Sequence, residues 1–320
     1  MQLTHQRSQH TVKGILKGAL VIASTLALFG CAVPNEYDEL QGSPVSGNSA
    51  KPHERDTVSI GIAFGGGAAR GVMHLGVIQA LQEEGIYADV VTGTSVGSIA
   101  AVLYANNPDY DVLAPTILSF SDRAIKDFII SRKGLIQGKA LADWVNNQIV
   151  HTDLSTMPVP VGIATTNLTT HEVYLFTGGN PGQAVQISSS VPGVFVPVSF
   201  KGDTFIDGGI LSMVPVYGAR DLGADIVIGI DVMCGAPPPV EPTAIGTLAS
   251  TFWLQSCAEP QHEVTTADIL ITPVPTNTRF DDFGDDAGRR EAIKNGYDAT
   301  MAKMPEIKAL LCEKDNQYCT

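Results

Sequence analysis

A serine stands at the centre of the pentapeptide Gly93-Thr94-Ser95-Val96-Gly97. Val90 and Val91 before it predict the end of a strand, and Ile99-Ala100-Ala101 after it predicts the first turn of a helix. So sharp a turn needs glycine on both sides of the serine, because larger side chains would clash. It would lift the hydroxyl out of the sheet, beside a helix N-terminus. Glycine makes up 32 of the 320 residues, so the pattern becomes specific only if the rest of a site accompanies it.

The segments around this turn follow the order of an α/β protein. An apolar strand over Val58–Phe64 leads through a glycine-rich loop into a helix whose apolar residues recur at helical spacing up to Gly85. The strand at Val90 and the helix from Ser98 come next, a rhythm typical of a parallel sheet covered by helices. We therefore expect a three-layer α/β/α fold with a mostly parallel central sheet. Further helices are predicted over 113–130, 140–150, 181–190, 215–222, 245–255 and 289–311, and further strands over 159–166, 172–176, 196–200, 204–206, 224–232 and 268–272.

The composition is that of a globular protein, with 44% hydrophobic and 17% charged residues. Twenty Lys and Arg against 33 Asp and Glu give a net charge of −13, which argues against a nucleic-acid partner. No basic cluster is available to bind anionic headgroups by charge alone, so contact with a membrane would need another attraction.

The N-terminus predicts such an attraction. Basic residues without acidic ones precede an apolar segment over 18–30 that is short for a spanning helix, which is typical of a secretory signal peptide. The segment ends Leu28-Phe29-Gly30-Cys31, which resembles the bacterial lipobox, with Phe29 bulkier than usual. Plain secretion or an uncleaved anchor is the alternative. In lipoproteins of this kind an Asp after the cysteine retains the protein at the inner membrane, so Ala32 points to the outer membrane, facing the periplasm.

Residues 31–56 are rich in Pro, Gly, Ser and Asn, which predicts a flexible tether. The expected organisation is a signal peptide over 1–30, this tether, and one domain over 57–320. That domain would have a motif-bearing core over about 58–232 and a C-terminal extension over 233–320.

Four cysteines remain in the domain, and in an oxidising periplasm they allow three connectivities. Cys312 with Cys319 would be an easy local pair, which leaves Cys234 with Cys257. No spacing suggests zinc, and no metal site is expected. The acidic run Asp281–Asp286 lacks the spacing of an EF-hand and favours a solvated loop.

A glycine-rich loop, Gly65-Gly66-Gly67-Ala68, lies between the first strand and the first helix of the domain. Backbone N–H groups can approach a ligand closely in such a loop, and the helix N-terminus favours negative charge. The spacing fits neither a dinucleotide fingerprint nor a P-loop, so no nucleotide cofactor is expected. An oxyanion site for acyl transfer fits better, because the serine turn follows one strand later. A merely tight turn is the alternative.

Two side chains could perform the chemistry. Ser95 is a candidate nucleophile, although serine is also a common helix N-cap. Asp207, in Asp207-Gly208-Gly209 at the end of a predicted strand, is a candidate general base, although Asp-Gly turns are common.

The order of these motifs resembles the patatin-like phospholipase family. It comprises the glycine loop with Arg70-Gly71, the Ser95 pentapeptide, the run from Ser189 to Pro197, and Asp207-Gly208-Gly209. The resemblance covers Val58 to Val232. It implies a Ser95–Asp207 dyad without a cofactor, an oxyanion hole from the N–H groups of Gly65, Gly66, Gly67 and Ala68, and support of that loop by Arg70.

The sequence departs from the family pattern at two places. Ala68 stands where the family commonly has glycine, which leaves open which N–H groups face the oxyanion. The stretch before Pro215 also lacks the asparagine often found there. A Ser-His-Asp triad through His74, His171 or His262 is disfavoured, because the loop-first order does not suit the α/β-hydrolase fold.

The resemblance and the predicted anchor together imply a lipid-anchored serine esterase acting on membrane phospholipids or lysophospholipids. Two alternatives stay open at this point. One is a thioesterase or small-ester hydrolase, and the other is an envelope lipoprotein that binds lipid with weak catalysis.

Overall fold

The computed structural model describes residues 35–46, 57–121, 127–129, 131–237, 240–257, 262–276 and 285–319. Their strands form one sheet in the order β1-β7-β8-β5-β4-β3-β9-β10, with β6 also paired to β5 and β2 to β6. The strands are β1 (Asn35–Glu36), β2 (Gln41–Pro44), β3 (Ile60–Phe64), β4 (Val90–Thr94), β5 (Val161–Asn167), β6 (Glu172–Gly178), β7 (Val198–Phe200), β8 (Asp203–Asp207), β9 (Ile226–Ile230) and β10 (Ile269–Ile271).

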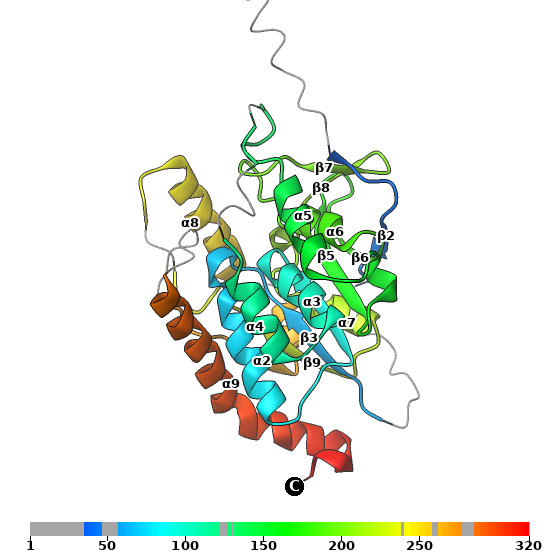
Figure 1. Cartoon of the computed structure of the whole chain (residues 1–320), viewed down its shortest axis with the longest axis vertical. Coiled ribbons are helices and arrows are strands. Elements are labelled where there is room, and N and C mark those ends of the chain that lie inside the picture. The colour runs from blue at the N-terminus through cyan, green and yellow to red at the C-terminus, as the bar shows by residue number, and fades with distance from the viewer. Residues whose placement is uncertain are drawn as a thin grey trace, which may run out of the picture.

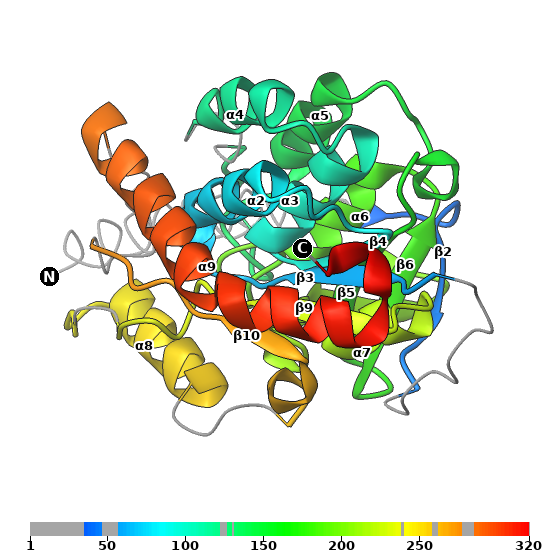
Figure 2. The same ribbon diagram turned by 90° about the horizontal axis from the view of Figure 1, so that it is seen from below.

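Helices cover this sheet on both faces. They are α2 (Met73–Glu83), α3 (Val96–Asn106), α4 (Tyr110–Leu118), α5 (Lys139–Gln148), α6 (Pro181–Ser188), α7 (Val216–Asp221), α8 (Ala244–Cys257) and α9 (Asp286–Lys314). Figure 1 shows the sheet enclosed by them, and in Figure 2 α2 to α5 lie above it and α7 and α8 below.

The central strands β5, β4, β3, β9 and β10 run parallel to one another. Strands β6 and β8 pair antiparallel with β5. Parallel strands need both faces covered, and β3, β4 and β9 are buried along their whole length. The predicted three-layer α/β/α fold with a mostly parallel sheet is confirmed.

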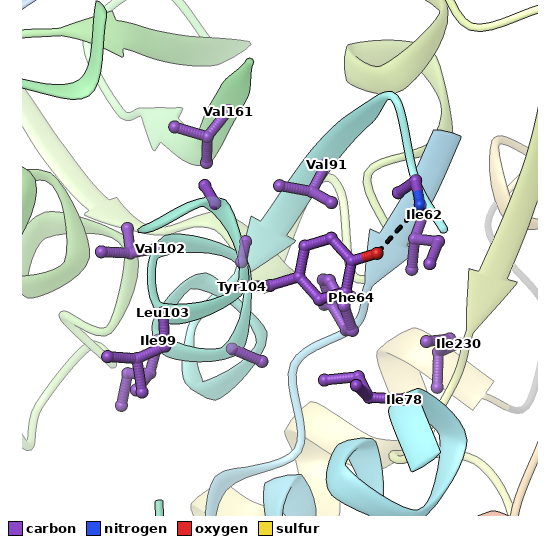
Figure 3. Close-up of a cluster of buried hydrophobic side chains, with 14 of the residues drawn as sticks. Ile62, Phe64, Ile78, Val91, Ile99, Val102, Leu103, Tyr104, Val161 and Ile230 are labelled. Atoms are coloured by element: carbon purple, nitrogen blue, oxygen red, sulfur yellow. Dashed lines mark hydrogen bonds between the residues drawn. The ribbon is translucent and has the colours of Figure 1, made fainter. Parts of the chain in front are cut away.

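Alternation along the strands divides the core into two layers. In β3, Ile62 and Phe64 pack toward α2 and α3, whereas Ala63 packs on the other face with Val216 and Ala219 of α7. Tyr104 of α3 reaches into the first layer near Ile62 and Phe64 (Figure 3), where its hydroxyl accepts the Ala88 N–H at 2.9 Å. These two layers hold β3 and β4 in place. The candidate site is built at the carboxyl ends of these two strands.

The prediction of a flexible tether does not hold for residues 35–46. Asn35–Glu36 pairs with β7 and Gln41–Pro44 with β6, both at the edge of the sheet. Leu40 between them is 1% exposed. Burial of this side chain, and the hydrogen bond from the Tyr37 hydroxyl to Gln186, outweigh the turn-rich composition that suggested a tether. The rest of the predicted tether, the signal peptide over 1–30, and Cys31 lie outside the described residues.

The long helix predicted over 113–130 is also wrong in part. Helix α4 ends at Leu118, and Phe128 instead forms an antiparallel bridge with Ile136. The run of bulky and β-branched residues from Phe128 suits an extended pairing at least as well as a helix. The other predicted helices and strands are present, with ends shifted by a few residues.

Both predicted disulfides form, Cys234 with Cys257 and Cys312 with Cys319. Among the described residues, no helix is both long enough and apolar enough to span a bilayer. Most of the acidic run at 281–286 lies outside them, and Asp285 caps α9 by accepting the Gly288 N–H at 2.8 Å.

Candidate active site

The turn at Ser95 has the sharp geometry that its glycines predict. Ser95 has φ 53° and ψ −123°, a left-handed conformation that is rare for a non-glycine residue and costs of the order of 1–3 kcal/mol. A Cβ on Gly97 would lie 2.1 Å from the Phe64 carbonyl oxygen, and one on Gly93 2.3 Å from that of Gly97. Packing of the strand against the helix therefore requires both glycines.

Ser95 occupies the N-cap position of α3, yet its side chain makes no capping hydrogen bond. The Ser98 hydroxyl donates instead to the Ser95 carbonyl. The Ser95 N–H donates to Ser188 Oγ at 2.8 Å, and Ser188 Oγ donates in turn to the Ala164 carbonyl at 2.6 Å. The hydroxyl of Ser95 is thus not used to start the helix, which argues against the simple N-cap interpretation.

Asp207 ends β8 and is buried, with 1% of its surface exposed. Its Oδ1 accepts the Gly209 N–H at 2.7 Å. Among the described residues, no donor meets the distance and angle limits of a hydrogen bond to its Oδ2. Burial raises the pKa of Asp207 to about 7, while the Gly209 N–H and the Ser95 hydroxyl lower it. One carboxylate oxygen is therefore fixed by the turn and the other is available to the serine.

The glycine loop corrects the predicted set of oxyanion donors. The Gly65 N–H donates to the Ile230 carbonyl at 2.9 Å, and the Gly66 N–H to the Met213 carbonyl at 3.0 Å. Both groups are therefore used to hold the loop on its neighbours. In the part of the chain that the structure describes, the N–H groups of Gly67 and Ala68 have no acceptor, as expected at the start of a helical turn. They are the two predicted donors that could serve an oxyanion.

The structure shows how alanine can stand at position 68, where the family commonly has glycine. The residue is exposed and has φ 50°, in the region where glycine is favoured. The backbone therefore keeps the conformation that a glycine would adopt, and the alanine methyl projects at the mouth of the cavity described next.

These residues line one cavity of about 120 Å³ at the carboxyl ends of β3 and β4. Ser95, Asp207, Gly67 and Ala68 meet there. The rest of the wall is apolar and comes from four further segments: Val191 and Val194 after α6, Met213 in the loop before α7, Met233 in the loop after β9, and Leu248, Ala249 and Phe252 of α8. A nucleophile, a base and backbone donors beside an apolar wall can perform acyl transfer on an ester with an apolar acyl group.

The family model for patatin-like phospholipase matches residues 62–220. The chain carries a domain of the patatin-like phospholipase family. The matched range includes the glycine loop, Ser95 and Asp207, but ends before α8.

Relatives of the patatin-like domain include lysophospholipases of fungi. The chain is 32% identical over 203 residues to lysophospholipase NTE1 of Mycosarcoma maydis, covering 62% of this chain and 11% of that protein. It is 29% identical over 201 residues to lysophospholipase NTE1 of Chaetomium globosum, covering 61% of this chain and 13% of that protein. The chain therefore spans about an eighth of these relatives' length.

Solved structures with a similar course of the chain include VipD from Legionella pneumophila, with 15% identity, a TM-score of 0.49, and coverage of 86% of this chain and 71% of that one. Another is the type III effector protein ExoU, with 12% identity, a TM-score of 0.45, and coverage of 81% and 54%.

Arg70 of the patatin-like domain contacts a second segment besides the glycine loop that it was predicted to support. Its side chain is 3% exposed, and Nη1 donates to the Met233 and Ala236 carbonyls at 2.7 Å each. Burial lowers its pKa to about 10, and Asp231 acts in the opposite direction. Arg70 thus joins the helical turn after the oxyanion loop to the segment that leads from Met233 toward α8.

None of the three histidines lines the cavity. His74 is fully buried and its Nε2 lies 2.9 Å from the Gly65 carbonyl oxygen, so it supports the glycine loop. Burial lowers its pKa to about 4. His171 is exposed in a turn, and His262 is exposed beside the Tyr217 hydroxyl. A triad is therefore disfavoured, and the described ranges hold no group of three His, Cys, Asp or Glu placed for a metal.

Several residues of the site were missed by sequence reasoning. Ser188 holds the Ser95 backbone, and the Ser190 carbonyl accepts the Asp207 N–H at 3.0 Å, so the end of α6 links both candidate catalytic residues. Leu248 and Phe252 come from α8, one turn apart, beyond the family match. The serine run before Val191 was a visible signal for the first pair, whereas the position of α8 depends on tertiary contacts alone.

The disulfide between Cys234 and Cys257 fastens the end of α8 beside Met233. It closes a loop of 23 residues, and changing both cysteines to serine should lower the free energy of unfolding by about 3 kcal/mol. Because α8 forms one wall of the cavity, we also expect a lower kcat/KM for long-chain esters.

Thermal unfolding and ester kinetics test this, with the pair Cys312→Ser and Cys319→Ser as the matched control. Equal loss of long-chain activity in both double variants would contradict a role of the first disulfide in placing α8.

Proposed function

We propose that this protein is a serine hydrolase of membrane lipids that cleaves the acyl esters of phospholipids or lysophospholipids through Ser95 and Asp207. The observation that carries the proposal is that Ser95 and the buried Asp207 carboxylate line the same apolar cavity. Ser95 has a strained backbone there, and its hydroxyl makes no capping hydrogen bond to α3. The family of the domain and its similarity to fungal lysophospholipases support the same class of substrate.

In the first step Ser95 Oγ attacks the ester carbonyl carbon while its proton passes to Asp207 Oδ2. The carbonyl oxygen becomes an oxyanion, which the Gly67 and Ala68 N–H groups stabilise by about 3–4 kcal/mol for each donor. The positive end of α3 lies at the same place and acts in the same direction. Collapse breaks the ester bond, and the leaving alcohol takes the proton from Asp207.

The second step removes the acyl group from Ser95. Asp207 accepts a proton from water, the water oxygen attacks the acyl carbon, and the free fatty acid leaves as Ser95 regains its proton. No metal or cofactor enters either step.

The anchor belongs to the same proposal. Lipidation at Cys31 after removal of residues 1–30 would hold the domain at a membrane, and Ala32 favours the outer membrane, facing the periplasm. Labelling of growing cells with a radioactive fatty acid tests this, with Cys31→Ser as the control that should lose the label.

The acyl preference is tested with p-nitrophenyl esters of increasing chain length. If the acyl chain lies against Leu248, Phe252 and Met213, each added methylene should raise kcat/KM about two- to fourfold until the cavity is filled. Equal kcat/KM for acetate and longer esters would favour a small-ester hydrolase. A preference for acyl thioesters over the matched oxygen esters would favour a thioesterase, and no turnover of any ester would favour a lipid-binding protein.

A further inference from the structure

A hairpin formed by residues 127–129 and 131–138, here called the apolar hairpin, carries large apolar side chains in solvent. Phe128 is 66% exposed and Leu135 is 52% exposed. They belong to adjoining sides of the hairpin, where Ile129 N donates to the Leu135 carbonyl at 2.9 Å. Arg132 and Lys133 at its tip are exposed as well. Two exposed apolar side chains beside a basic tip are the composition that suits the headgroup region of a bilayer.

The apolar hairpin is continuous with the wall of the candidate active site. Leu135 N and Ile136 N donate to the Val194 carbonyl at 2.8 Å and 3.0 Å, and Val196 N donates to the Ile136 carbonyl at 2.9 Å. Val194 lines the cavity that holds Ser95. In Figure 1 the hairpin rises at the end of the molecule where β7 and β8 lie. A surface that received the hairpin would therefore also lie close to the mouth of the cavity.

The first described strand of the chain lies at this same place. Asn35 begins β1, and its Nδ2 donates to the Gln137 carbonyl of the apolar hairpin at 2.8 Å. Cys31 precedes Asn35 by four residues, which span about 14 Å at most when fully extended. A lipid on Cys31 would thus hold the hairpin within about that distance of the membrane, whereas a tether over 31–56 would have left the domain free to turn.

Charge alone does not supply the attraction. Glu36 and Asp38 follow Asn35 and are exposed, and Asp127 lies at the base of the hairpin, where it accepts the Gly138 and Ala140 N–H groups. These carboxylates oppose Arg132 and Lys133 at an anionic surface. The apolar side chains therefore have to carry the contact, and burial of one Phe or Leu side chain corresponds to more than a tenfold partition.

We propose that the apolar hairpin is a membrane-docking surface, occupied by a phospholipid bilayer into which Phe128 and Leu135 insert beside the mouth of the cavity. This inference rests on the proposed lipid hydrolase and on lipidation at Cys31. Docked in this way, the site takes its acyl esters directly from the membrane that carries the anchor.

The test compares two substrates for the full chain: lipid in vesicles of phosphatidylcholine and phosphatidylglycerol, and a soluble short-chain ester. Phe128→Glu with Leu135→Glu should lower vesicle hydrolysis at least about tenfold and change soluble-ester hydrolysis less than about twofold. Val150→Glu is the matched control. Val150 is 84% exposed, and its N–H donates to Asn106 at the far end of α3 from Ser95, so both rates should stay within about twofold.

A second measurement does not depend on catalysis or on the charged variants. In a Ser95→Ala background, the fluorescence that Phe128→Trp adds to that of the two native tryptophans should be quenched by brominated acyl chains in the same vesicles, and the fluorescence that Val150→Trp adds should not. Equal quenching at both positions, or none at 128, would overturn the docking surface. Absence of soluble-ester turnover in the unaltered protein would instead sink the proposed function, while the quenching would still decide the docking.

Discussion

Ser95→Ala should lower kcat for ester hydrolysis by at least about 10³-fold, with little change in thermal stability. The nucleophile is lost, so the ester can react only by direct attack of water. The oxyanion donors and the apolar cavity still accelerate that slower reaction. The Ser95 hydroxyl makes no capping bond to α3, so its removal leaves the helix intact. Steady-state kinetics on the best p-nitrophenyl ester, together with calorimetry, measure both quantities.

Ser189→Ala is the matched control for this variant. Ser189 is buried close to the site, and within the described ranges its hydroxyl has no hydrogen-bond partner. Its loss should therefore leave kcat within about twofold, since no buried partner is left unpaired. Activity that survives in Ser95→Ala at the level of this control would remove Ser95 from the mechanism.

Asp207→Asn should lower kcat about 10³- to 10⁴-fold while keeping the shape of the site. An amide can still accept the Gly209 N–H at Oδ1, but it cannot take the proton of Ser95. The unaltered protein should also lose activity as the pH falls through about 7, because burial raises the pKa of Asp207 to about 7 and only the ionised form accepts the proton. A pH profile of kcat/KM that stays flat between 6 and 8 would contradict this assignment.

The Asp207 carboxylate should also make the folded state less stable at the pH values at which it is ionised and can act as the base. The pKa of Asp207 is higher in the folded chain than its ordinary value of 3.8, so folding is favoured by the protonated form. Stability should therefore fall as the pH rises from about 4 to about 7. Each pKa unit corresponds to about 1.4 kcal/mol. Asp207→Asn should consequently unfold at a higher temperature than the unaltered protein at pH 8, with the difference vanishing below about pH 4.

Much of the site could be predicted because it depends on local geometry. Glycine at 93 is required by the backbone of Gly97 within the same turn, so the serine turn is visible in the pentapeptide itself. Asp207 follows a strand on a glycine turn for a similarly local reason. The continuous apolar runs of β3 and β9 likewise reflect the two layers that cover the sheet on both faces.

The remainder depends on contacts between distant segments. Nothing in Gly65 or Gly66 indicates that Ile230 and Met213 accept their N–H groups and so remove them from the oxyanion hole. Leu40 and Tyr37 lie in a stretch whose composition suggests a tether, and only their burial against the sheet shows that the chain is folded there. The position of α8, which forms one wall of the cavity, likewise depends on contacts between segments distant in the sequence.

The central claim is that Asp207 activates Ser95 for attack on an acyl ester. The most direct measurement is labelling of the full chain with a fluorophosphonate, followed by location of the adduct by peptide mass spectrometry, in the unaltered protein and in Asp207→Asn. The account predicts an adduct on Ser95 that disappears in Asp207→Asn. No adduct on folded protein, an adduct on another residue, or equal labelling of both proteins would contradict it.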